Sequence, residues 1–447
     1  MLQPQIFKAN DIRGIVGPQW DAAGAYALGL AYAELVDWPR IVVGRDMRVT
    51  SPMIHDTVIQ ALRDRGKTVV DIGLASTDEV WFAAGWLDLP AIQVTSSHNP
   101  SQYNGLKFCS PAAKPVTSDF LTRLAGRATE LDTGQVPQPT ARGAREQLDV
   151  LGTYTDYLLS LVDLSRMRPL KVVVDAGNGM GGHTAPQVLS HLDVEVIGLY
   201  LDLDGTFPHH QPNPLEPKNV EDACAAVREH GADLGIVFDG DADRVFMVDE
   251  RGEIIPPSAI AAMIAVHELA REPGATIVVN TITSSAVKEI VEEAGGTVVQ
   301  SKVGHTYMKA LMASEGAIFG GEHSAHYYFR DFYGADTGML AALHVLAGLS
   351  ACDLPVSQLV AGYTRYAASG EINSVVTDPT ATMNRVSIAL GGVDVGGGDG
   401  VKLLGDQWWV SLRPSNTEPL LRLNVEARDP ADMARLRDTV LDLVKED

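Results

Sequence analysis

Short apolar, β-branched segments alternate with amphipathic segments through most of the chain, and this alternation restricts the possible folds more than any other feature. The apolar segments lie at residues 40–44, 68–73, 91–95, 171–177, 233–238 and 275–280. Amphipathic segments typical of helices lie between them, at 52–66, 219–230 and 284–295. Strands that alternate with helices form βαβ units, in which helices cover both faces of mainly parallel sheets. The sequence therefore predicts an α/β protein.

The alternation breaks at three places, which predict the edges of domains. Residues 134–147 are poor in apolar side chains and carry Gly and Pro, and a second edge falls near Gly252. From Gly370 onward several strands follow one another, TDPTAT (377–382) is expected as a turn among them, and a charged helix at 429–445 follows. This pattern favours a smaller α+β unit. We therefore expect domains at 1–148, 149–252, 253–368 and 369–447.

The charge and the cysteine content exclude several classes of protein. Among 447 residues, Asp and Glu number 57 and Lys and Arg 35, a net charge of −22. Such a chain has no general affinity for nucleic acid or anionic membranes, so an anionic ligand needs a locally basic site. The three cysteines are far apart, which excludes a disulfide framework and a thiolate zinc site. The N-terminus lacks an unbroken apolar run, so we expect a cytoplasmic protein, whose oligomeric state the sequence does not indicate.

Three aspartates follow one of the apolar segments in close succession. They are Asp239, Asp241 and Asp243 in DLGIVFDGDADRVFMVD, and Arg244 comes directly after them. Carboxylates this close repel one another unless a cation lies between them. Mg²⁺ prefers oxygen ligands of this kind. The segment therefore predicts a magnesium site at the end of a strand, with a solvated acidic turn as the alternative.

Two other chemistries fit parts of the same segment. In a calcium-binding EF-hand loop the aspartates and Glu250 would be ligands, but Arg244 stands where that loop needs Gly, and strands flank the segment in place of helices. Asp239 could instead accept a phosphoryl group directly, although the neighbouring carboxylates add like charge. The EF-hand is therefore disfavoured, and an aspartyl-phosphate enzyme remains an alternative.

A second polar cluster, TSSHNP (95–100), follows the apolar segment at 91–95, and Lys107 comes shortly after it. Small hydroxyl side chains at the end of a strand, followed by an Asn-Pro turn, place a nucleophile on a loop. The sequence identifies no partner acid for His98. Taken alone, the cluster is thus also consistent with an ordinary loop.

Two further segments are suited to binding a sugar and a phosphate. In GEHSAH (321–326), glycines let the backbone approach a ligand, and a carboxylate and a hydroxyl can bind sugar hydroxyls; the candidates are Glu322, Ser324 and His326. In RPSNT (413–417), a guanidinium and hydroxyls in a tight turn can hold a phosphate; the candidates are Arg413, Ser415, Asn416 and Thr417. Each segment could equally be a structural turn.

A glycine motif in KVVVDAGNGMGGHTA competes with these interpretations. Gly177, Gly179 and Gly182 fit the dinucleotide-binding pattern after a strand, and Asp202 and Asp204 stand at a suitable distance beyond them. A nicotinamide enzyme would leave the three aspartates and the RPSNT turn without roles. We therefore disfavour it.

Together the four segments supply what phosphoryl transfer needs: a metal site, cationic groups, an acceptor and a proton relay. The chain also resembles a known family, the α-D-phosphohexomutases, in the phosphomannomutase/phosphoglucomutase branch. The resemblance spans nearly the whole chain, in FKANDIRG (7–14), GRD (44–46), TSSHNP (95–100), NGLK (104–107), DAGNG (175–179), FDGDADR (238–244), GEHSAH (321–326) and RPSNTEP (413–419).

The resemblance implies four domains around a central cleft: three related α/β units with mixed, mainly parallel sheets, and a smaller C-terminal α+β domain that binds phosphate. It implies that Ser97 is carried as a phosphoserine. Mg²⁺ would be held by one phosphate oxygen on Ser97 and by Asp239, Asp241 and Asp243, while Arg244 would steady the phosphate. It also assigns the glycine motif to structure.

The reaction that the resemblance implies is the interconversion of hexose 6-phosphate and hexose 1-phosphate, of mannose, glucose or both, by an isomerase. Phospho-Ser97 gives its phosphoryl group to the sugar, and the resulting hexose 1,6-bisphosphate, which is also the activator, returns the other one. Arg13 and Lys107 resemble the family's basic residues near the transferring group, and Lys107 or His305 is the expected proton-transfer residue. The expected phosphosugar ligands are Glu322, Ser324, His326, Arg413, Ser415, Asn416, Thr417 and Arg422.

Several residues depart from patterns common in the family. Asn10 stands where some relatives have an aromatic residue, and VNTITS (279–284) lacks a lysine that some carry. Phosphoglucosamine mutases usually have Ser-Gly-Thr in the last loop and Gln near Glu322, so Asn416 and His323 favour mannose and glucose phosphates. A phosphoglucosamine mutase and a phosphosugar-binding protein without turnover remain alternatives.

Overall fold

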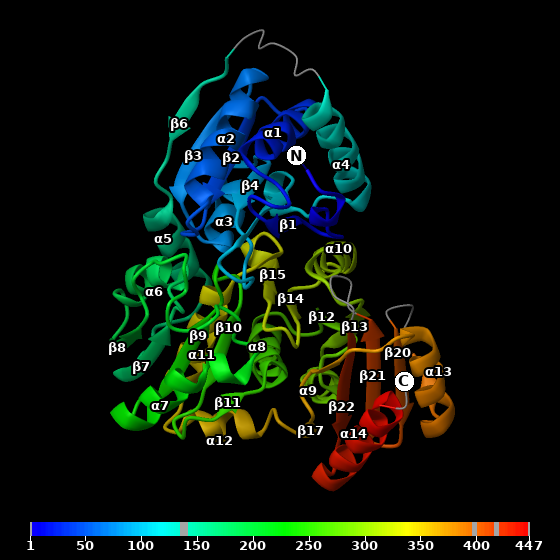
Figure 1. The fold of residues 1–447 in the computed structure, drawn as a ribbon. Coiled ribbons are helices and arrows are strands. Elements are labelled where there is room, and N and C mark those ends of the chain that lie inside the picture. The colour runs from blue at the N-terminus through cyan, green and yellow to red at the C-terminus, as the bar shows by residue number, and fades with distance from the viewer. Residues whose placement is uncertain (1, 135–141, 396–399, 415–419, 446–447) are drawn as a thin grey trace.

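A computed structural model describes residues 2–134, 142–395, 400–414 and 420–445, which form four sheets with their helices (Figure 1). The first unit, blue to cyan, lies at the top of Figure 1; the second and third, green to yellow, lie below it; and the fourth, orange to red, lies at the lower right. None of the helices in these ranges is long and apolar enough to cross a membrane. Cys109, Cys224 and Cys352 are free thiols.

The first unit is a six-stranded sheet in the order β1-β5-β4-β2-β3-β6. Its strands are β1 (Ile12–Ile15), β2 (Arg40–Arg45), β3 (Thr68–Leu74), β4 (Ala91–Val94), β5 (Tyr103–Cys109) and β6 (Arg145–Gln147). Its helices are α1 (Ala22–Leu35), α2 (Ser51–Asp64), α3 (Thr77–Leu87) and α4 (Ser118–Thr133), with short 3₁₀ turns at Pro4–Ile6 and Pro111–Ala113.

The second unit is a five-stranded sheet in the order β11-β10-β9-β7-β8. Its strands are β7 (Leu170–Asp175), β8 (Val194–Leu199), β9 (Leu234–Phe238), β10 (Val245–Val248) and β11 (Ile254–Ile255). Its helices are α5 (Leu151–Leu161), α6 (Gly181–Leu189) and α7 (Glu221–His230), with a 3₁₀ turn at Pro217–Asn219.

The third unit is a five-stranded sheet in the order β13-β12-β14-β15-β16. Its strands are β12 (Thr276–Asn280), β13 (Thr297–Ser301), β14 (Phe319–Gly321), β15 (Tyr327–Phe329) and β16 (Ala335–Asp336). Its helices are α8 (Pro257–Arg271), α9 (Ser285–Glu293), α10 (His305–Glu315), α11 (Gly338–Ser350) and α12 (Val356–Ala361), with a 3₁₀ turn at Arg330–Phe332.

These three units repeat one strand arrangement. In each, a central strand (β2, β7 or β12) pairs in parallel with two other strands. One of these two (β4, β9 or β14) is followed along the chain by a strand that pairs with it antiparallel (β5, β10 or β15). The loop at that antiparallel turn is 95–102 in the first unit, 239–244 in the second and 322–326 in the third. The segments that carry Ser97, the three aspartates and Glu322 therefore occupy the same topological position in three related sheets.

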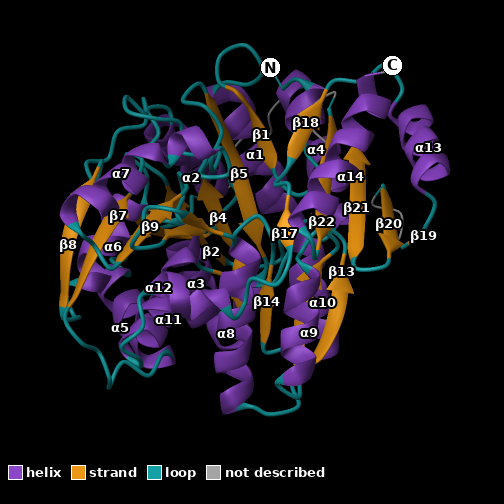
Figure 2. Ribbon diagram, turned by 90° about the horizontal axis from the view of Figure 1, so that it is seen from below, coloured by secondary structure: helices purple, strands orange, loops and turns teal. Residues whose placement is uncertain are grey.

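The fourth unit is an antiparallel sheet in the order β17-β22-β21-β20-β19, with β18 also paired to β22. Figure 2 shows its two helices next to these strands. The elements are β17 (Ala367–Ala368), β18 (Ile372–Ser374), α13 (Pro379–Leu390), β19 (Val393–Asp394), β20 (Val401–Gly405), β21 (Trp408–Pro414), β22 (Leu421–Ala427) and α14 (Pro430–Lys445). The expectation of a turn at 377–382 was wrong, because Asp378 caps a helix that starts at Pro379.

The apolar clusters follow this division only in part. One cluster joins the second and third units to α3 and to one face of the first sheet, and a second lies on the other face of that sheet. A third, which includes Val386, Val410 and Val440, belongs to the fourth unit. The predicted fold class, three related α/β units and a smaller α+β unit, is confirmed. The domain boundaries stay predictions. The second sheet takes in β11 and the fourth takes in β17, each a little outside the expected range.

Candidate active site

Ser97 lies in the loop after β4, in a backbone conformation that most residues avoid. Its φ is +48°, and its backbone N–H donates to Oγ1 of Thr95 at 3.0 Å. The buried Oγ donates to Oδ2 of Asp239 at 2.9 Å and lies 3.4 Å from Nη2 of Arg244. A Cβ on Gly240 would lie 2.4 Å from the carbonyl oxygen of Ser97, so only glycine permits this approach of the two loops.

Arg48, a fully buried residue, holds the shape of the Ser97 loop. Its guanidinium donates to the carbonyl oxygens of Ser97 and Asn99 at 2.6 Å, of Pro100 at 2.8 Å and of Tyr103 at 3.0 Å. Nε of Arg48 lies 3.2 Å from Oδ2 of Asp46. A planar guanidinium with five donors is suited to several carbonyl groups at once.

The three aspartates of the 239–244 loop come together as the sequence suggested. Their side chains are buried, and one oxygen atom of each lies within 4.8 Å of those of the others. Nζ of Lys107 lies 2.6 Å from both Asp241 and Asp243, and Arg244 lies 2.8 Å from Asp239. Oδ1 of Asp241 and Oδ1 of Asp243 have no hydrogen-bond partner among the described residues. An all-oxygen donor set with unpaired buried oxygens fits a hard divalent cation.

Burial and neighbouring charge shift the pKa values of this cluster in different directions. Burial raises the pKa of Asp239 to about 7, although Arg244 opposes the shift. Burial would lower the pKa of Lys107, but Asp241 and Asp243 outweigh it and raise that pKa above its ordinary value. Burial tends to raise the pKa of Asp243, but the charges of Lys107 and His326 outweigh it, so that pKa is lowered. Lys107 is therefore a permanent cation in this arrangement.

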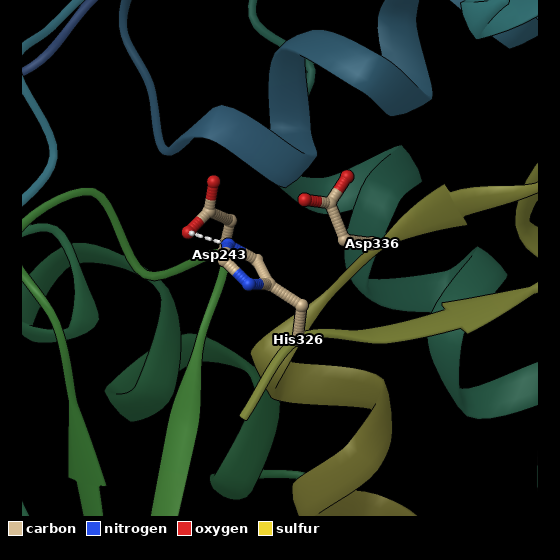
Figure 3. Close-up of side chains that lie close together, drawn as sticks. All are labelled: Asp243, His326 and Asp336. Atoms are coloured by element: carbon tan, nitrogen blue, oxygen red, sulfur yellow. Dashed lines mark ion pairs between the residues drawn. The ribbon is translucent and has the colours of Figure 1, made fainter. Parts of the chain in front are cut away.

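The third loop meets the second at a bridge between Arg244 and His326. The buried Glu322 accepts hydrogen bonds from Asn280 at 2.9 Å and from the hydroxyl of Tyr328 at 2.6 Å. Nδ1 of His326 lies 2.9 Å from Oγ of Ser324. Figure 3 shows the His326 ring directed at Asp243, with Asp336 close by. The structure therefore brings Glu322, Ser324 and His326 to the edge of the aspartate cluster.

Arg13 and His305 approach the same region from other elements. Arg13 on β1 donates to Oδ1 of Asn99 at 2.7 Å and pairs with Asp11 at 2.5 Å. His305 is the first residue of α10, and burial together with the Lys309 cation lowers its pKa to about 4. The imidazole of His305 is therefore neutral near pH 7.

The phosphate-binding candidates of the fourth unit lie on a separate sheet. Arg413 on β21 and Arg422 on β22 face each other across the strand pair, and both pair with Glu371, at 3.6 and 3.3 Å. These ion pairs of Arg413 and Arg422 do not involve residues of the cluster around Ser97. Ser415, Asn416 and Thr417 lie outside the described residues.

The glycine motif serves packing. A Cβ on Gly179 would lie 2.7 Å from the carbonyl oxygen of Gly240, and one on Gly182 would lie 2.0 Å from that of Leu201. Gly179 lets the backbone pass close to the aspartate loop, and Gly182 lets the start of α6 pack against the backbone at Leu201.

Sequence patterns alone missed several residues that shape the site. Thr77, the first residue of α3, donates a hydrogen bond from its hydroxyl to Asp241. Arg48 holds the Ser97 loop, and Asn280 and Tyr328 hold the side chain of Glu322. The only sequence signal for Thr77 is the Ser76–Glu79 capping box, which predicts a helix start and not a contact. Arg48 stands two residues after the GRD motif, without a pattern of its own.

Sequence models of the four domains of phosphoglucomutase/phosphomannomutase match this chain in order. The α/β/α domains I, II and III match residues 4–135, 152–252 and 256–366, and the C-terminal domain matches 371–443. The chain belongs to this family. A phosphomannomutase of Escherichia coli is 39% identical over 100% of both chains, and a protein of Xanthomonas campestris pv. campestris named phosphohexose mutases is 40% identical over 96% of this chain and 97% of its own.

A solved structure agrees with the family assignment. The crystal structure of a phosphoglucomutase/phosphomannomutase family protein from Burkholderia thailandensis superposes with a TM-score of 0.89 at 32% identity, over 100% of this chain and 98% of its own. The family and the class of enzyme expected from the sequence, an isomerase that acts as a phosphohexose mutase, are confirmed. The roles of individual residues remain predictions.

Proposed function

We propose that this mutase interconverts hexose 6-phosphate and hexose 1-phosphate, of mannose, glucose or both, with Ser97 as the residue that carries the phosphoryl group. The observation that carries the proposal is the position of Ser97 Oγ, 2.9 Å from Asp239 and 3.4 Å from Arg244. A hydroxyl held between an acidic cluster and a guanidinium, with Lys107 nearby, is placed for phosphoryl transfer rather than for packing.

Mg²⁺ is the cation that this cluster fits best. Asp239, Asp241 and Asp243 would hold it together with a phosphate oxygen on Ser97, and the unpaired oxygens of Asp241 and Asp243 support this assignment. When bound, the ion would neutralise charge on the phosphoryl group.

The proposed reaction has two transfers. In the first, a hydroxyl oxygen of the hexose monophosphate attacks the phosphorus on Ser97, the bond between Ser97 Oγ and phosphorus breaks, and the hydroxyl proton passes to a base. The product is a hexose 1,6-bisphosphate. After this intermediate reorients, Ser97 Oγ attacks its other phosphorus and the bond between that phosphorus and the sugar oxygen breaks. The base returns its proton to that oxygen, and the sugar leaves as the isomeric monophosphate. Arg244, which lies beside Ser97, would stabilise the charge in both transfers.

The two candidates for proton transfer differ in charge. Lys107 is paired with two carboxylates that raise its pKa, which suits a cation that stabilises the transferring group. His305 is neutral near pH 7, which suits a proton acceptor. We therefore assign charge stabilisation to Lys107 and Arg13, and the proton to His305.

Sugar binding is assigned to the third unit and phosphate binding to the fourth. Glu322, fixed by Asn280 and Tyr328, would accept hydrogen bonds from sugar hydroxyls, with Ser324 and His326 beside it. The phosphate that does not react would be held by Arg413, Ser415, Asn416, Thr417 and Arg422.

The test combines mass spectrometry with a coupled assay. Intact and peptide-mapped protein should carry one phosphate on Ser97, and the assay with mannose 1-phosphate or glucose 1-phosphate, Mg²⁺ and a trace of glucose 1,6-bisphosphate should show turnover. Ser97→Ala should lose the phosphate and the turnover. Ser96→Ala is the matched control, because the buried Ser96 hydroxyl has no hydrogen-bond partner in the described part of the chain.

The other outcomes separate the alternatives. Full activity of Ser97→Ala would contradict the assignment and favour an aspartyl-phosphate route through Asp239. Turnover of glucosamine phosphate in preference to both other sugars would favour a phosphoglucosamine mutase. An unmodified Ser97 without turnover, even after priming with bisphosphate, would favour a phosphosugar-binding protein.

A further inference from the structure

A second group of potential metal ligands lies beside the aspartate loop. It consists of Asp243, His326 and Asp336, whose ligand atoms all lie within 4.8 Å of one another (Figure 3). Asp243 directly precedes Arg244 and β10, His326 directly precedes β15, and Asp336 ends β16. Both carboxylates are about 2% exposed. Three elements of two different units thus bring together two buried carboxylates and a partly buried imidazole.

The orientation of the His326 ring is that of a metal ligand. Nδ1 lies 2.9 Å from Oγ of Ser324 and 3.4 Å from Oε2 of Glu322, so polar partners engage this nitrogen. Nε2 lies on the opposite side, 3.7 Å from Oδ1 of Asp243, which is too far for a hydrogen bond. Histidines that bind metals commonly engage a carboxylate through one nitrogen and leave the other for the ion.

The two carboxylates are held in place while leaving room for a cation. Oδ2 of Asp243 lies 2.6 Å from Lys107, whereas its Oδ1 is buried and has no hydrogen-bond partner among the described residues. Asp336 is fixed by Lys309 at 2.6 Å. A buried carboxylate oxygen without a partner is costly, and an ion between it and Nε2 of His326 would satisfy both.

We propose that Asp243, His326 and Asp336 form a second divalent-cation site that shares only Asp243 with the Asp239–Asp241–Asp243 cluster. One imidazole nitrogen and two carboxylates form a ligand set that Zn²⁺ and Co²⁺ accept, whereas Mg²⁺ prefers oxygen ligands alone. The second site is therefore selective for a transition metal.

Occupancy of the second site inhibits the enzyme. Zn²⁺ there engages His326 and Asp243, which the proposed reaction needs for sugar binding and for the first cation site. The binding itself does not depend on the proposed reaction, so a failure of either can be recognised separately.

Equilibrium dialysis of the chelator-treated full-length protein against Zn²⁺, at a fixed excess of Mg²⁺ and with elemental analysis, tests the site. Wild type should retain one equivalent of zinc, and Asp336→Asn and His326→Gln should bind it at least about ten-fold more weakly. Asp241→Asn, which removes a ligand of the first cluster and none of the second, should retain it. Asp331→Asn, a carboxylate on the nearby Arg330–Phe332 turn, is the matched control.

Co²⁺ provides a second measurement that does not depend on activity. Its visible absorption should appear in wild type and Asp241→Asn and should weaken in His326→Gln, which removes the nitrogen ligand. Asp336→Asn removes the carboxylate that pairs with Lys309, so the thermal unfolding of this variant must be compared with that of wild type. If Asp336→Asn does not fold, the zinc affinity of His326→Gln alone tests the proposal. Unchanged zinc affinity in His326→Gln, or loss of zinc in Asp241→Asn, would overturn the proposal and place the ion in the first cluster.

Discussion

The hydroxyl of Thr77 donates a 2.6 Å hydrogen bond to Oδ2 of Asp241, and its backbone N–H donates to the carbonyl oxygen of Asp241 at 3.0 Å. Thr77 begins α3, whose start is fixed by a capping box between Ser76 and Glu79. A rigid helix terminus of the first unit thus holds the central aspartate of the second. The position of Asp241 depends on contacts between units as well as on its own loop.

Replacement of Thr77 by Val should weaken the response to Mg²⁺. Valine has nearly the same shape but lacks the hydroxyl, so Asp241 loses a buried donor while the packing changes little. We expect the Mg²⁺ concentration for half-maximal activity to rise about ten-fold to a hundred-fold. A Mg²⁺ titration of mutase activity measures it. Thr77→Ser retains the hydroxyl and should behave like wild type; an unchanged titration of Thr77→Val would show that this contact has no functional role.

Local patterns were sufficient to predict six of the strands that pair in parallel, but they missed β6, β8, β13 and β14. The six apolar segments coincide within two residues with β2, β3, β4, β7, β9 and β12, because a strand buried on both faces consists of a continuous apolar run. The aspartates were recognisable because three carboxylates in close succession repel one another unless a cation lies between them. The Ser97 segment, by contrast, was assigned only through the resemblance to the family.

Contacts between distant residues could not be predicted in this way. Thr77 and Asp241 are 164 positions apart, and no periodicity relates two units that pack through loops. Arg48 is a fully buried arginine on the way into α2, where charge alone predicts exposure. The start of α13 was missed for a different reason: Asp-Pro suits both a turn and a helix N-terminus, and local chemistry does not distinguish them.

Gly240→Ala should damage both stability and turnover. The added Cβ would meet the carbonyl oxygen of Ser97 at 2.4 Å, so the Ser97 loop and the aspartate loop must move apart. Such overpacking costs about 1–3 kcal/mol, and the separation of Ser97 from Asp239 should lower kcat. Thermal unfolding and steady-state kinetics measure the two effects. In the control Gly126→Ala, the Cβ meets nothing within 4 Å, so that variant should lose neither.

Arg48→Met should destabilise the protein far more than the same change at Arg40. Arg48 is buried and pairs with a buried Asp46, so its loss leaves an uncompensated charge and four carbonyl oxygens without their donor; we expect a cost of about 3–5 kcal/mol. Arg40 pairs with Glu146, and both are nearly half exposed, so that pair contributes about 1 kcal/mol or less. Urea unfolding should separate the two variants. Equal midpoints would contradict the assignment of Arg48 to the loop.

Asp78, next to Thr77, is a buried carboxylate held by hydroxyls from three units. It accepts hydrogen bonds from Ser76, from Tyr154 at 2.6 Å and from Thr337 at 2.7 Å. Burial raises the pKa of Asp78 from 3.8 to about 7, and the hydroxyl donors only partly oppose the shift. This junction therefore binds a proton in the folded protein over a range where the unfolded chain has released it.

The raised pKa of Asp78 predicts a loss of stability as the pH rises. Its contribution is complete below about pH 4, where folded and unfolded chains are both protonated, and falls until the pH passes about 7. Asp78→Asn removes this titration, so its thermal unfolding midpoint should decline less than that of wild type between these values. Differential scanning calorimetry at several pH values makes the comparison, with Asp88→Asn as a control in the exposed C-cap of the same helix. Parallel curves for wild type and Asp78→Asn would show that Asp78 is ionised throughout, with its charge stabilised by the three hydroxyl donors.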